Sequence, residues 1–370
     1  MNDPRPQRLA VADDDVATRV AATVRADVRA LRAYAVAMAE GMIKLDANES
    51  LWGLPEAVRQ KLGAALADVA LNRYPDGGAD AVRDALRATF GLSDEVALVL
   101  GNGSDEILQL ITNAVAQPGA TVLAPDPTFV MYRAYAAHAR MRYVAVPLRE
   151  DLSLDCDAML AAIERERPAL VWLASPNNPT GTLFDPADVE RIVRAAPGLA
   201  VVDEAYVAYA SSAFLPRVLE FPNLVVVRTL SKIGMAGMRL GCAAAHPAWI
   251  AEIDKLRSPY NVNALTQAAA LVLLAEDELF ARQTAAVRAE RASLASRVAA
   301  LPGVRVFPSE ANFVVARFPE ADATFAALRD AGILVKNVSA SHPLLAGCLR
   351  ITVGTPTEND ALVEALERRT

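Results

Sequence analysis

The sequence predicts an α/β protein with a mostly parallel central sheet in a large domain and a second, smaller α+β domain. Between residues 96 and 227, apolar runs of strand length alternate with helical patterns, which is typical of parallel strands covered by helices on both faces. Beyond residue 261 the pattern changes to two helical stretches followed by short strands, which favours a separate smaller domain. The 370 residues suffice for a substantial core and two domains.

The expected elements follow in chain order. Residues 1–43 form a polar arm with a helix near 16–31, and we expect this arm to join the small domain. We expect the large domain over 44–260 and the small domain over 261–370. The large domain should hold strands at 96–100, 121–123, 143–146, 170–173, 199–202 and 224–227, with helices from Ser104 and near Thr128. The small domain should hold helices at 264–275, 277–301 and 323–331, strands at 304–307, 313–318, 333–335 and 349–353, and a last helix.

Charge and hydropathy exclude two classes of partner. The 37 basic and 44 acidic residues give a net charge of −7, whereas a nucleic-acid surface needs clustered basic side chains. The most apolar run, 268–275, is too short to span a bilayer. Three aspartates occupy 13–15, where a secretory signal would be apolar. We therefore expect a soluble, cytoplasmic protein that binds neither nucleic acid nor membrane.

The cysteines and histidines predict neither a disulfide framework nor a metal site. Cys156, Cys242 and Cys348 are scattered along the chain and odd in number, which fits a reducing compartment and small apolar side chains. The three histidines lie apart from one another and from the cysteines in the sequence. We therefore expect no metal cofactor.

Four short motifs lie across the middle of the chain, just after predicted strands. They read Gly-Asn-Gly-Ser-Asp-Glu at 101–106, Ser-Pro-Asn-Asn-Pro-Thr-Gly at 175–181, Asp-Glu-Ala-Tyr at 203–206 and Thr-Leu-Ser-Lys at 229–232. Each alone is weak, because short motifs recur by chance. Open α/β sheets bind ligands at the carboxyl ends of their strands. Together the motifs supply a phosphate cradle, a phenolate-oxygen donor, a carboxylate and a lysine, which are the groups that hold pyridoxal phosphate.

Lys232 is the predicted centre of this site. An ordinary lysine has a pKa of about 10.4 and is a poor nucleophile at neutral pH, so a Schiff-base lysine needs desolvation or a nearby cation. Ser231 and Arg239 suit a phosphate group, and the cation would also lower the lysine pKa. The alternative is a solvated surface lysine, which is what most lysines are.

Asp203 and Tyr206 follow the predicted strand 199–202. A carboxylate at that rim can pair with the pyridine nitrogen and preserve the electron sink of the cofactor. Tyr206, on the same turn, can donate a hydrogen bond to the phenolate oxygen. The alternative is an acidic residue that ends a strand, beside a core tyrosine.

The other two motifs supply further candidates. The amide of Asn178 can donate to the same phenolate oxygen, although its Asn-Pro and Thr-Gly neighbours also make a plain turn. Gly103, Ser104 and Asp105 open a helix whose free backbone N–H groups attract phosphate, or Ser104 or Asp105 simply caps that helix. Phe129 either stacks on the pyridine ring or belongs to the core.

Arg350 is a charged residue at the start of an apolar strand in the small domain. A guanidinium in that setting usually has a planar anionic partner. The partner is either a substrate anion or a structural salt bridge, and the strand context alone leaves both open.

The segments that carry a family resemblance extend over nearly the whole chain beyond the arm. They read Lys-Leu-Asp-Ala-Asn-Glu at 44–49, Leu-Asn-Arg-Tyr-Pro at 71–75, Arg-Thr-Leu-Ser-Lys at 228–232 and Cys-Leu-Arg-Ile-Thr-Val-Gly-Thr at 348–355. With the motifs above, they make the chain resemble the aspartate-aminotransferase superfamily of fold type I. Within that superfamily it resembles the histidinol-phosphate aminotransferases, which are class-II pyridoxal-phosphate enzymes.

The resemblance implies a role for each candidate. Lys232 forms the Schiff base and moves the proton, and Asp203 holds the pyridinium nitrogen. Asn178 and Tyr206 bind the phenolate oxygen. The phosphate of the cofactor is held by the backbone of Ser104 and Asp105 after Gly103, and by Ser231 and Arg239. Tyr74 is expected to reach the phosphate of the neighbouring subunit's cofactor, which implies a homodimer with shared active sites. Arg350 is expected to bind the substrate phosphate, with Lys336, Asn48 and Tyr260 as further substrate-side candidates.

The chain departs from the family pattern in three places. Lys336 stands where many relatives have arginine, which keeps the charge and loses the bidentate fork. Phe129 replaces a frequent tyrosine and loses a hydroxyl. Arg239 follows Lys232 by seven positions, one fewer than in many relatives, so its role requires a tighter turn.

The resemblance implies transfer of the amino group of histidinol phosphate to 2-oxoglutarate, giving imidazole-acetol phosphate and glutamate in L-histidine biosynthesis. An aromatic amino acid aminotransferase is an alternative, because imidazole and phenyl rings can share a pocket and Arg350 would accept a carboxylate. A threonine-phosphate decarboxylase, a lyase on the same scaffold, is another. A regulator with this fold would need a DNA-binding domain, and the first 40 or so residues lack a helix-turn-helix pattern.

Overall fold

The computed structural model describes residues 13–31 and 40–369, which belong to two compact units, 1–38 and 39–370. The first unit contains α1 (Asp13–Thr23) and α2 (Ala26–Arg29). The single helix expected near 16–31 is therefore two helices. Arg25, at the break between them, donates to the carboxylate of Asp27 through Nε at 3.0 Å. The rest of the predicted arm before Asp13 and over 32–39 lies outside the described residues.

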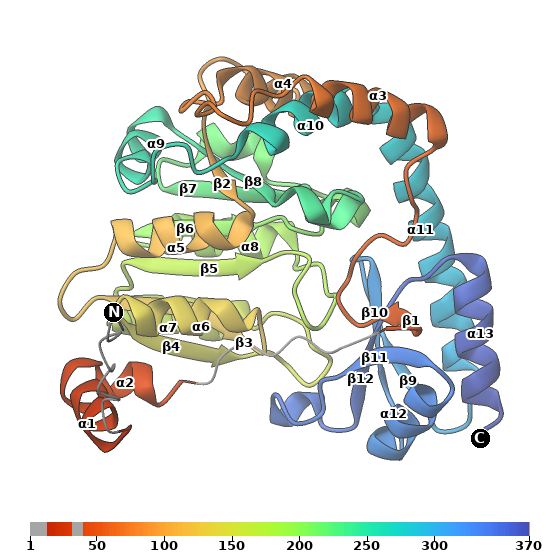
Figure 1. Cartoon of the computed structure of the whole chain (residues 1–370). Coiled ribbons are helices and arrows are strands. Elements are labelled where there is room, and N and C mark those ends of the chain that lie inside the picture. The colour runs from red at the N-terminus through yellow and green to blue at the C-terminus, as the bar shows by residue number, and fades with distance from the viewer. Residues whose placement is uncertain (1–12, 32–39, 370) are drawn as a thin grey trace, which may run out of the picture. The chain divides into compact units, whose positions relative to one another are not determined.

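A seven-stranded sheet forms the centre of the second unit (Figure 1). Its strand order is β2-β8-β7-β6-β5-β3-β4. The strand β8 is antiparallel to both of its neighbours, and all other neighbouring strands are parallel. The predicted strands are confirmed, and the mostly parallel α/β sheet with them. The strands are β2 (Ala97–Asn102), β3 (Thr121–Asp126), β4 (Arg142–Pro147), β5 (Leu170–Ala174), β6 (Leu199–Asp203), β7 (Leu224–Thr229) and β8 (Leu240–Ala245).

Helices cover both faces of this sheet, because alternate residues of each strand are buried on opposite sides. In β6, Leu199 and Val201 belong to one core cluster and Ala200 and Val202 to the other. Figure 1 shows α5, α6, α7 and α8 running along these strands. The first cluster includes α5 (Ser104–Ala114), α6 (Val130–His138) and α9 (Pro247–Asp254), and the second includes α4 (Asp80–Phe90), α7 (Cys156–Glu166), α8 (Pro186–Ala195) and α10 (Ala264–Leu274).

The strand β8 was not expected from the sequence. Its residues, Leu-Gly-Cys-Ala-Ala-Ala, include no β-branched or aromatic side chain, so local propensity gives little signal. It forms because it fits between β2 and β7, antiparallel to both. Its position matters for the site, because a Cβ on Gly241 would lie 2.5 Å from the backbone nitrogen of Ser104.

A second sheet of five strands has the order β1-β11-β12-β10-β9. Its first strand, β1 (Ile43–Leu45), pairs in parallel with β11; the sequence pattern did not predict this strand. The others, β9 (Arg305–Phe307), β10 (Phe313–Arg317), β11 (Ile333–Asn337) and β12 (Cys348–Thr352), lie close to their predicted ranges. The predicted domain boundaries at 43 and 260 stay predictions.

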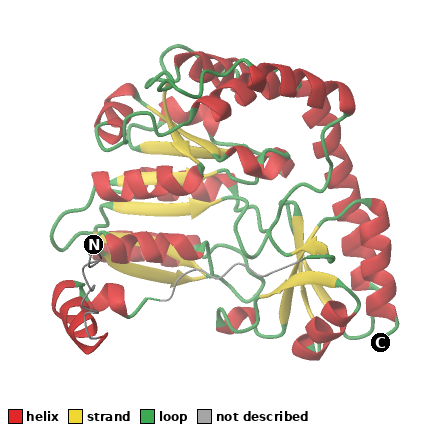
Figure 2. Ribbon diagram, in the orientation of Figure 1, coloured by secondary structure: helices red, strands yellow, loops and turns green. Residues whose placement is uncertain are grey.

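Helices α11, α12 and α13 pack against this second sheet, whereas α3 lies beside α4 and α10 (Figure 1 and Figure 2). The long helix α11 follows α10, and α12 and α13 complete the chain. In no helix within 13–31 or 40–369 is there an apolar stretch long enough to cross a membrane. The bounds are α3 (Glu56–Ala67), α11 (Asp277–Ala299), α12 (Ala321–Asp330) and α13 (Pro356–Glu367), with short 3-10 turns η1 (Val207–Tyr209), η2 (Leu215–Glu220), η3 (Ser231–Ile233), η4 (Ala236–Met238) and η5 (Pro343–Leu345).

Candidate active site

The predicted site residues of the large sheet lie where its strands end. Asp203 is the last residue of β6, and Lys232 lies in η3 directly after β7. Asn178 lies in the loop after β5, and Gly103 joins β2 to α5. Because parallel strands end at one edge of a sheet, these segments converge there.

Lys232 and Tyr206 lie together. The Nζ atom of Lys232 is 5.7 Å from the centre of the Tyr206 ring and 3.5 Å from the carbonyl oxygen of Ala47. The backbone of Lys232 is held from the other side, because the Tyr209 hydroxyl donates to its carbonyl at 2.6 Å. The amine of Lys232 therefore lies in a half-buried position over an aromatic face.

Asp203 is a buried carboxylate at the centre of this edge. Its side chain accepts hydrogen bonds from the Tyr132 hydroxyl at 2.7 Å and from the backbone N–H of Ala205 at 3.0 Å. Burial raises the pKa of Asp203 to about 6, although both hydrogen bonds act in the opposite direction. A buried carboxylate with so few donors is suited to a cationic partner.

Tyr132 is a site residue that the sequence analysis missed. It lies on α6, is fully buried, and stacks on the Trp172 ring with a centroid distance of 4.8 Å. Burial and the Asp203 carboxylate raise the pKa of Tyr132 well above its ordinary value, so its hydroxyl stays a donor. Its spacing of three from Phe129 on one helix face was the available signal.

Glu204, beside Asp203, has a structural role instead. Its carboxylate accepts from the backbone N–H groups of Phe214 and Leu215 and from Arg228. These bonds hold the segment after β6 against the edge of the sheet and leave Asp203 as the acid of this pair that faces the site.

The turn before α5 has the geometry of an anion cradle. Gly103 is the N-cap with a φ of 83°, and no side chain caps the helix, so neither Ser104 nor Asp105 is the cap that was considered as an alternative. A Cβ at Gly103 would lie 2.5 Å from Nη2 of Arg239. A glycine, the first backbone N–H groups of a helix and a guanidinium therefore meet at one place.

Arg239 reaches the cradle because the segment after Lys232 turns tightly. Gly234 and Arg239 both have left-handed backbone conformations, with φ of 100° and 52°. Nη1 of Arg239 lies 3.4 Å from the Ser231 hydroxyl, and Nη2 lies 3.7 Å from the Asp105 carboxylate. The shorter spacing between Lys232 and Arg239 is thus accommodated by two left-handed residues.

Arg350 reaches from the second sheet to the loop that follows β5. Its Nη1 donates to Oδ1 of Asn178 at 2.7 Å and its Nη2 to the carbonyl of Asp46 at 2.6 Å. Accepting from Arg350 through its oxygen leaves the Asn178 amide nitrogen as a donor. Lys336 is exposed and lies opposite Arg350 in the pairing of β11 with β12, so the two cations share one face of the sheet.

Asn48 connects the two sheets at the site. Its amide nitrogen donates to the Tyr206 hydroxyl at 3.0 Å, and its oxygen accepts from Thr352 at 3.2 Å. Asn312 donates to its backbone carbonyl at 3.0 Å. Asn48 is fully enclosed and has a φ of 55°, a conformation that asparagine tolerates better than most residues.

The three remaining candidates are aromatic and lie in two places. Phe129 contacts the Tyr132 ring edge-on, with a centroid distance of 5.6 Å, and Tyr132 in turn donates to Asp203. Tyr74 and Tyr260 stack on each other with a centroid distance of 4.7 Å. Tyr74 is 82% exposed, so it is available to another molecule.

The arrangement fits pyridoxal phosphate. The cradle at Gly103 suits its phosphate, Asp203 its pyridinium nitrogen, Tyr206 and the Asn178 amide its phenolate oxygen, and Lys232 its aldehyde. Every side chain needed for these contacts is on the same edge of the large sheet or reaches it from the second sheet. The individual assignments stay predictions that follow from this geometry.

Comparisons with known proteins point the same way. The family described as aminotransferase class I and II matches residues 40–366. The histidinol-phosphate aminotransferase of Chromobacterium violaceum is 54% identical over 345 residues, which cover 93% of this chain and 97% of that protein. Histidinol-phosphate aminotransferase 1 of Ralstonia nicotianae is 52% identical over 357 residues, 95% of either chain.

Solved structures share the fold. The structure of histidinol-phosphate aminotransferase from Sinorhizobium meliloti in complex with pyridoxal-5'-phosphate has a TM-score of 0.82 and 26% identity, covering 94% of this chain and 98% of that one. The family resemblance drawn from the sequence motifs is therefore confirmed.

Proposed function

The chain belongs to the class I and II aminotransferase family, and we propose that it is a histidinol-phosphate aminotransferase of L-histidine biosynthesis. It transfers the amino group of histidinol phosphate to 2-oxoglutarate and yields imidazole-acetol phosphate and glutamate. The observation that carries the proposal is the 54% identity to the Chromobacterium violaceum enzyme across 97% of its length. The site geometry supports it, because it joins the residues that such a reaction needs.

Pyridoxal phosphate is the proposed cofactor, and when bound it supplies an aldehyde that accepts the amino group and a ring that withdraws electrons. Asp203 holds its ring nitrogen, and the Gly103 turn, Ser231 and Arg239 hold its phosphate. Tyr206 and Asn178 orient the ring through the phenolate oxygen. Phe129 covers one side of the ring from its position beside Tyr132.

Lys232 is the proposed catalytic base. Its Nζ takes the proton from the α-carbon of histidinol phosphate, and in the second half-reaction it returns a proton to the α-carbon of glutamate. The half-buried position over the Tyr206 ring keeps this amine close to the reacting carbon.

Arg350 is the proposed anion receptor for substrates. Its guanidinium is fixed by Asn178 and the Asp46 carbonyl, so it offers a preorganised charge to the phosphate of histidinol phosphate or a carboxylate of glutamate. Lys336, opposite it, adds a second positive charge. Asn48 and Tyr260 are further substrate-side residues in this proposal.

We further propose that the enzyme works as a homodimer in the cytoplasm. The exposed Tyr74 is the side chain that reaches the cofactor phosphate of the neighbouring subunit. Each active site would then contain residues of both chains.

The experiment that tests the proposed function is an absorbance measurement on the cofactor-loaded enzyme. Histidinol phosphate is added without any keto acid, and 2-oxoglutarate is added afterwards. We expect the aldehyde form of the cofactor to convert to pyridoxamine phosphate and then to return. A spectrum that ignores histidinol phosphate but responds to phenylalanine or tyrosine would instead make the enzyme an aromatic aminotransferase. Loss of carbon dioxide from threonine phosphate would make it a decarboxylase.

A further inference from the structure

A chain of polar side chains joins the phosphate cradle to the tyrosine pair. The pair consists of Tyr74, before α4, and Tyr260, between α9 and α10. The cradle lies at the start of α5. Three residues connect the two places: Glu106, Asn261 and Arg257. None of them belongs to the proposed cofactor or substrate contacts.

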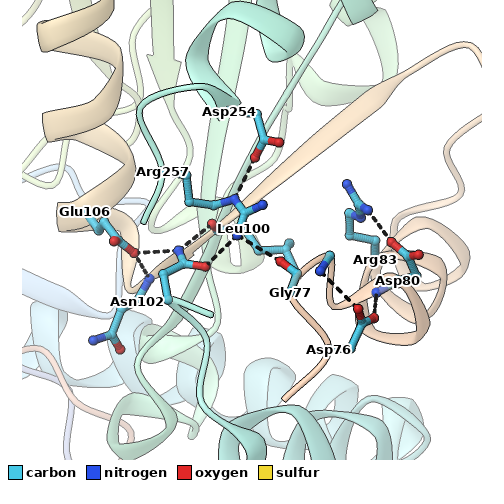
Figure 3. Close-up of polar contacts among 11 residues, drawn as sticks. Asp76, Gly77, Asp80, Arg83, Leu100, Asn102, Glu106, Asp254 and Arg257 are labelled. Atoms are coloured by element: carbon cyan, nitrogen blue, oxygen red, sulfur yellow. Dashed lines mark hydrogen bonds and ion pairs between the residues drawn. The ribbon is translucent and has the colours of Figure 1, made fainter. Parts of the chain in front are cut away.

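The chain begins at Glu106, in the first turn of α5 (Figure 3). Its Oε2 accepts from the backbone N–H of Asn102 at 2.5 Å and from Nδ2 of Asn261 at 2.8 Å. Asn102 directly precedes Gly103. The carboxylate of Glu106 therefore fixes the residue from which the cradle turn starts.

Asn261 is the middle member, and its amide has a partner on each atom. Nδ2 donates to Glu106 and to the carbonyl of Leu100 at 3.0 Å, and Oδ1 accepts from Nη1 of Arg257 at 3.1 Å. Rotating the amide by half a turn would place its oxygen against two acceptors and its nitrogen against a donor. The amide can therefore satisfy this environment in one orientation.

Arg257 forms the other end of this series of side chains (Figure 3). Besides Asn261, its Nη1 donates to the carbonyl of Gly77 at 2.9 Å, and its Nε donates to Asp254 at 2.6 Å. The side chain is only 15% exposed. A planar guanidinium can make these bonds in fixed directions at once, and a lysine ammonium on a flexible stem cannot.

The backbone that Arg257 holds lies against the Tyr260 ring, on which Tyr74 stacks. Tyr260 directly precedes Asn261 and has a left-handed φ of 59°, which is unfavourable for an aromatic residue and needs support from its surroundings. A Cβ on Gly77 would lie 3.4 Å from the Tyr260 ring, so that ring lies against the Gly77 backbone. Gln267 connects the same two segments, because its Nε2 donates to the carbonyls of Asp76 and Val262, both at 2.9 Å.

We propose that Glu106, Asn261 and Arg257 are positioning residues that fix the tyrosine pair Tyr74–Tyr260 relative to the turn that binds the cofactor phosphate. This inference rests on the proposed function, which assigns the cofactor phosphate to that turn and substrate or cofactor contacts to the two tyrosines. Substituting any one of these three side chains loosens the cradle and the tyrosine pair together. Cofactor affinity and the KM for histidinol phosphate therefore change in parallel, while the chemical groups that touch either molecule remain in place.

The test uses Arg257→Lys and Asn261→Ala in the full-length enzyme. The dissociation constant of pyridoxal phosphate is measured by fluorescence on the apoenzyme, and kcat and KM are measured on the loaded enzyme. Loss of one hydrogen bond to a charged group corresponds to about tenfold in affinity. We expect both variants to raise the cofactor Kd and the KM for histidinol phosphate by about that factor, with a smaller change in kcat.

Arg87→Lys is the matched control. Arg87 is a partly buried arginine on α4, and it donates to the carbonyls of Ser93 at 2.6 Å and Val96 at 2.7 Å. It contacts neither the cradle nor the tyrosines in the hydrogen bonds described. A cofactor Kd and KM that stay within about twofold of wild type in both test variants, or that rise equally in Arg87→Lys, overturn the proposal.

A double-mutant cycle separates positioning from general stability. If Arg257 acts through the tyrosines, Arg257→Lys changes the KM for histidinol phosphate far less when Tyr260→Ala is already present. Additive effects on KM overturn that part of the proposal. If an Arg257 variant fails to fold, Glu106→Gln with Tyr260→Ala forms the same cycle. The neutral amide oxygen of glutamine accepts the Asn102 and Asn261 hydrogen bonds more weakly than the carboxylate does.

The cofactor measurement keeps this proposal distinct from the proposed function. A wild-type enzyme that ignores histidinol phosphate disproves the substrate assignment, and the positioning role is then judged from the cofactor Kd of the variants alone. An unchanged cofactor Kd in variants of an enzyme that does use histidinol phosphate overturns the positioning role and leaves the proposed function standing.

Discussion

At the scale of single residues, the site is built from charged groups whose partners lie on other elements. Asp203 accepts a hydrogen bond from the hydroxyl of Tyr132 on α6. Arg350 on β12 donates to Asn178, which lies in a loop of the other sheet. Such groups are expensive to bury without partners. Their protonation and their fixed directions are therefore properties of the folded chain that single substitutions can test.

The pH dependence of apoenzyme stability tests the environment of Asp203. Burial raises its pKa from an ordinary 3.8 to about 6. Between these values the folded protein keeps a proton that the unfolded chain has lost. This group therefore makes the free energy of unfolding fall as pH rises through the folded pKa of about 6, and the effect levels off at higher pH. Urea denaturation of wild type and Asp203→Asn between about pH 4 and 8 measures the free energy of unfolding of both proteins.

The difference between those two proteins isolates the carboxylate from all other titrating groups. We expect the stability of Asp203→Asn relative to wild type to increase across that window and then stay constant. If the stability difference does not vary with pH, or varies in the opposite direction, the pKa of Asp203 is not raised in the folded protein.

The guanidinium of Arg350 is the second residue-scale prediction. Arg350→Lys keeps the charge but cannot reproduce the two directed bonds to Asn178 and the Asp46 carbonyl. We expect the KM for histidinol phosphate to rise about tenfold or more, and the cofactor Kd to change much less. Steady-state kinetics and cofactor titration give both values.

A matched arginine lies on the neighbouring strand. Arg317 on β10 donates to the carbonyls of Ala346 and Leu344, so Arg317→Lys removes similar bonds without touching the site. Equal losses of substrate and cofactor binding in Arg350→Lys would assign Arg350 a structural role, the alternative that the sequence left open.

At the scale of elements, the site depends on how β2 leads into α5. The antiparallel strand β8 packs Gly241 against the backbone of Ser104, and Glu106 holds Asn102. The N-terminus of α5 is thus fixed from two sides with its first N–H groups left for an anion. The glycine between them, Gly103, is the point at which an added methyl group would meet Arg239.

Gly103→Ala tests this turn. Alanine at a φ of 83° is strained, and such strain costs about 1–3 kcal/mol. The new Cβ would also displace the Arg239 guanidinium from the cradle. We expect lower thermal stability together with a cofactor Kd raised about tenfold or more.

Gly119→Ala is its control, because Gly119 has a φ of 79° and no atom within 4 Å of an added Cβ. Both variants should lose similar stability, and only Gly103→Ala should bind the cofactor more weakly. Weakened cofactor binding in both would mean that strain, and not the displaced arginine, is responsible.

At the scale of the whole molecule, the site lies where two sheets meet. Asn48 and Arg350 join the second sheet to the edge of the first through Tyr206 and Asn178. The tyrosine pair is exposed, and in the proposed dimer Tyr74 reaches the site of the second copy. Neither sheet alone carries every group that the proposed reaction needs.

Mixing two inactive variants tests the proposed dimer. Lys232→Ala should abolish turnover while non-covalent cofactor binding persists, and Tyr74→Ala should weaken cofactor retention strongly. If active sites are shared, mixed dimers contain one site with both native residues, so mixing after reversible dissociation should restore activity. Tyr74→Phe, which keeps the ring, serves as a comparison for the hydroxyl. A mixture no more active than the sum of its separate components would contradict shared sites.

The sequence alone determined the α/β class, nearly all strands of both sheets and the motif residues. Apolar strands such as 224–227 and turn-forming motifs such as 175–181 are local patterns. Such patterns can be recognised in the sequence without knowing which residues are neighbours in space. The family resemblance rested on the same segments. Lys232, Asp203 and Gly103 were found because each lies at or just after the end of a strand.

The tertiary structure alone decided what holds those residues. Tyr132 appears in the sequence as an ordinary helix residue, and Glu106 appears only as the end of a motif with no role of its own. Their partners Asp203 and Asn261 are 71 and 155 positions away. The strand β8 has alanines in place of β-formers and exists because β2 and β7 flank it. Hydrogen bonding and burial depend on spatial neighbours, which periodicity along the chain does not specify.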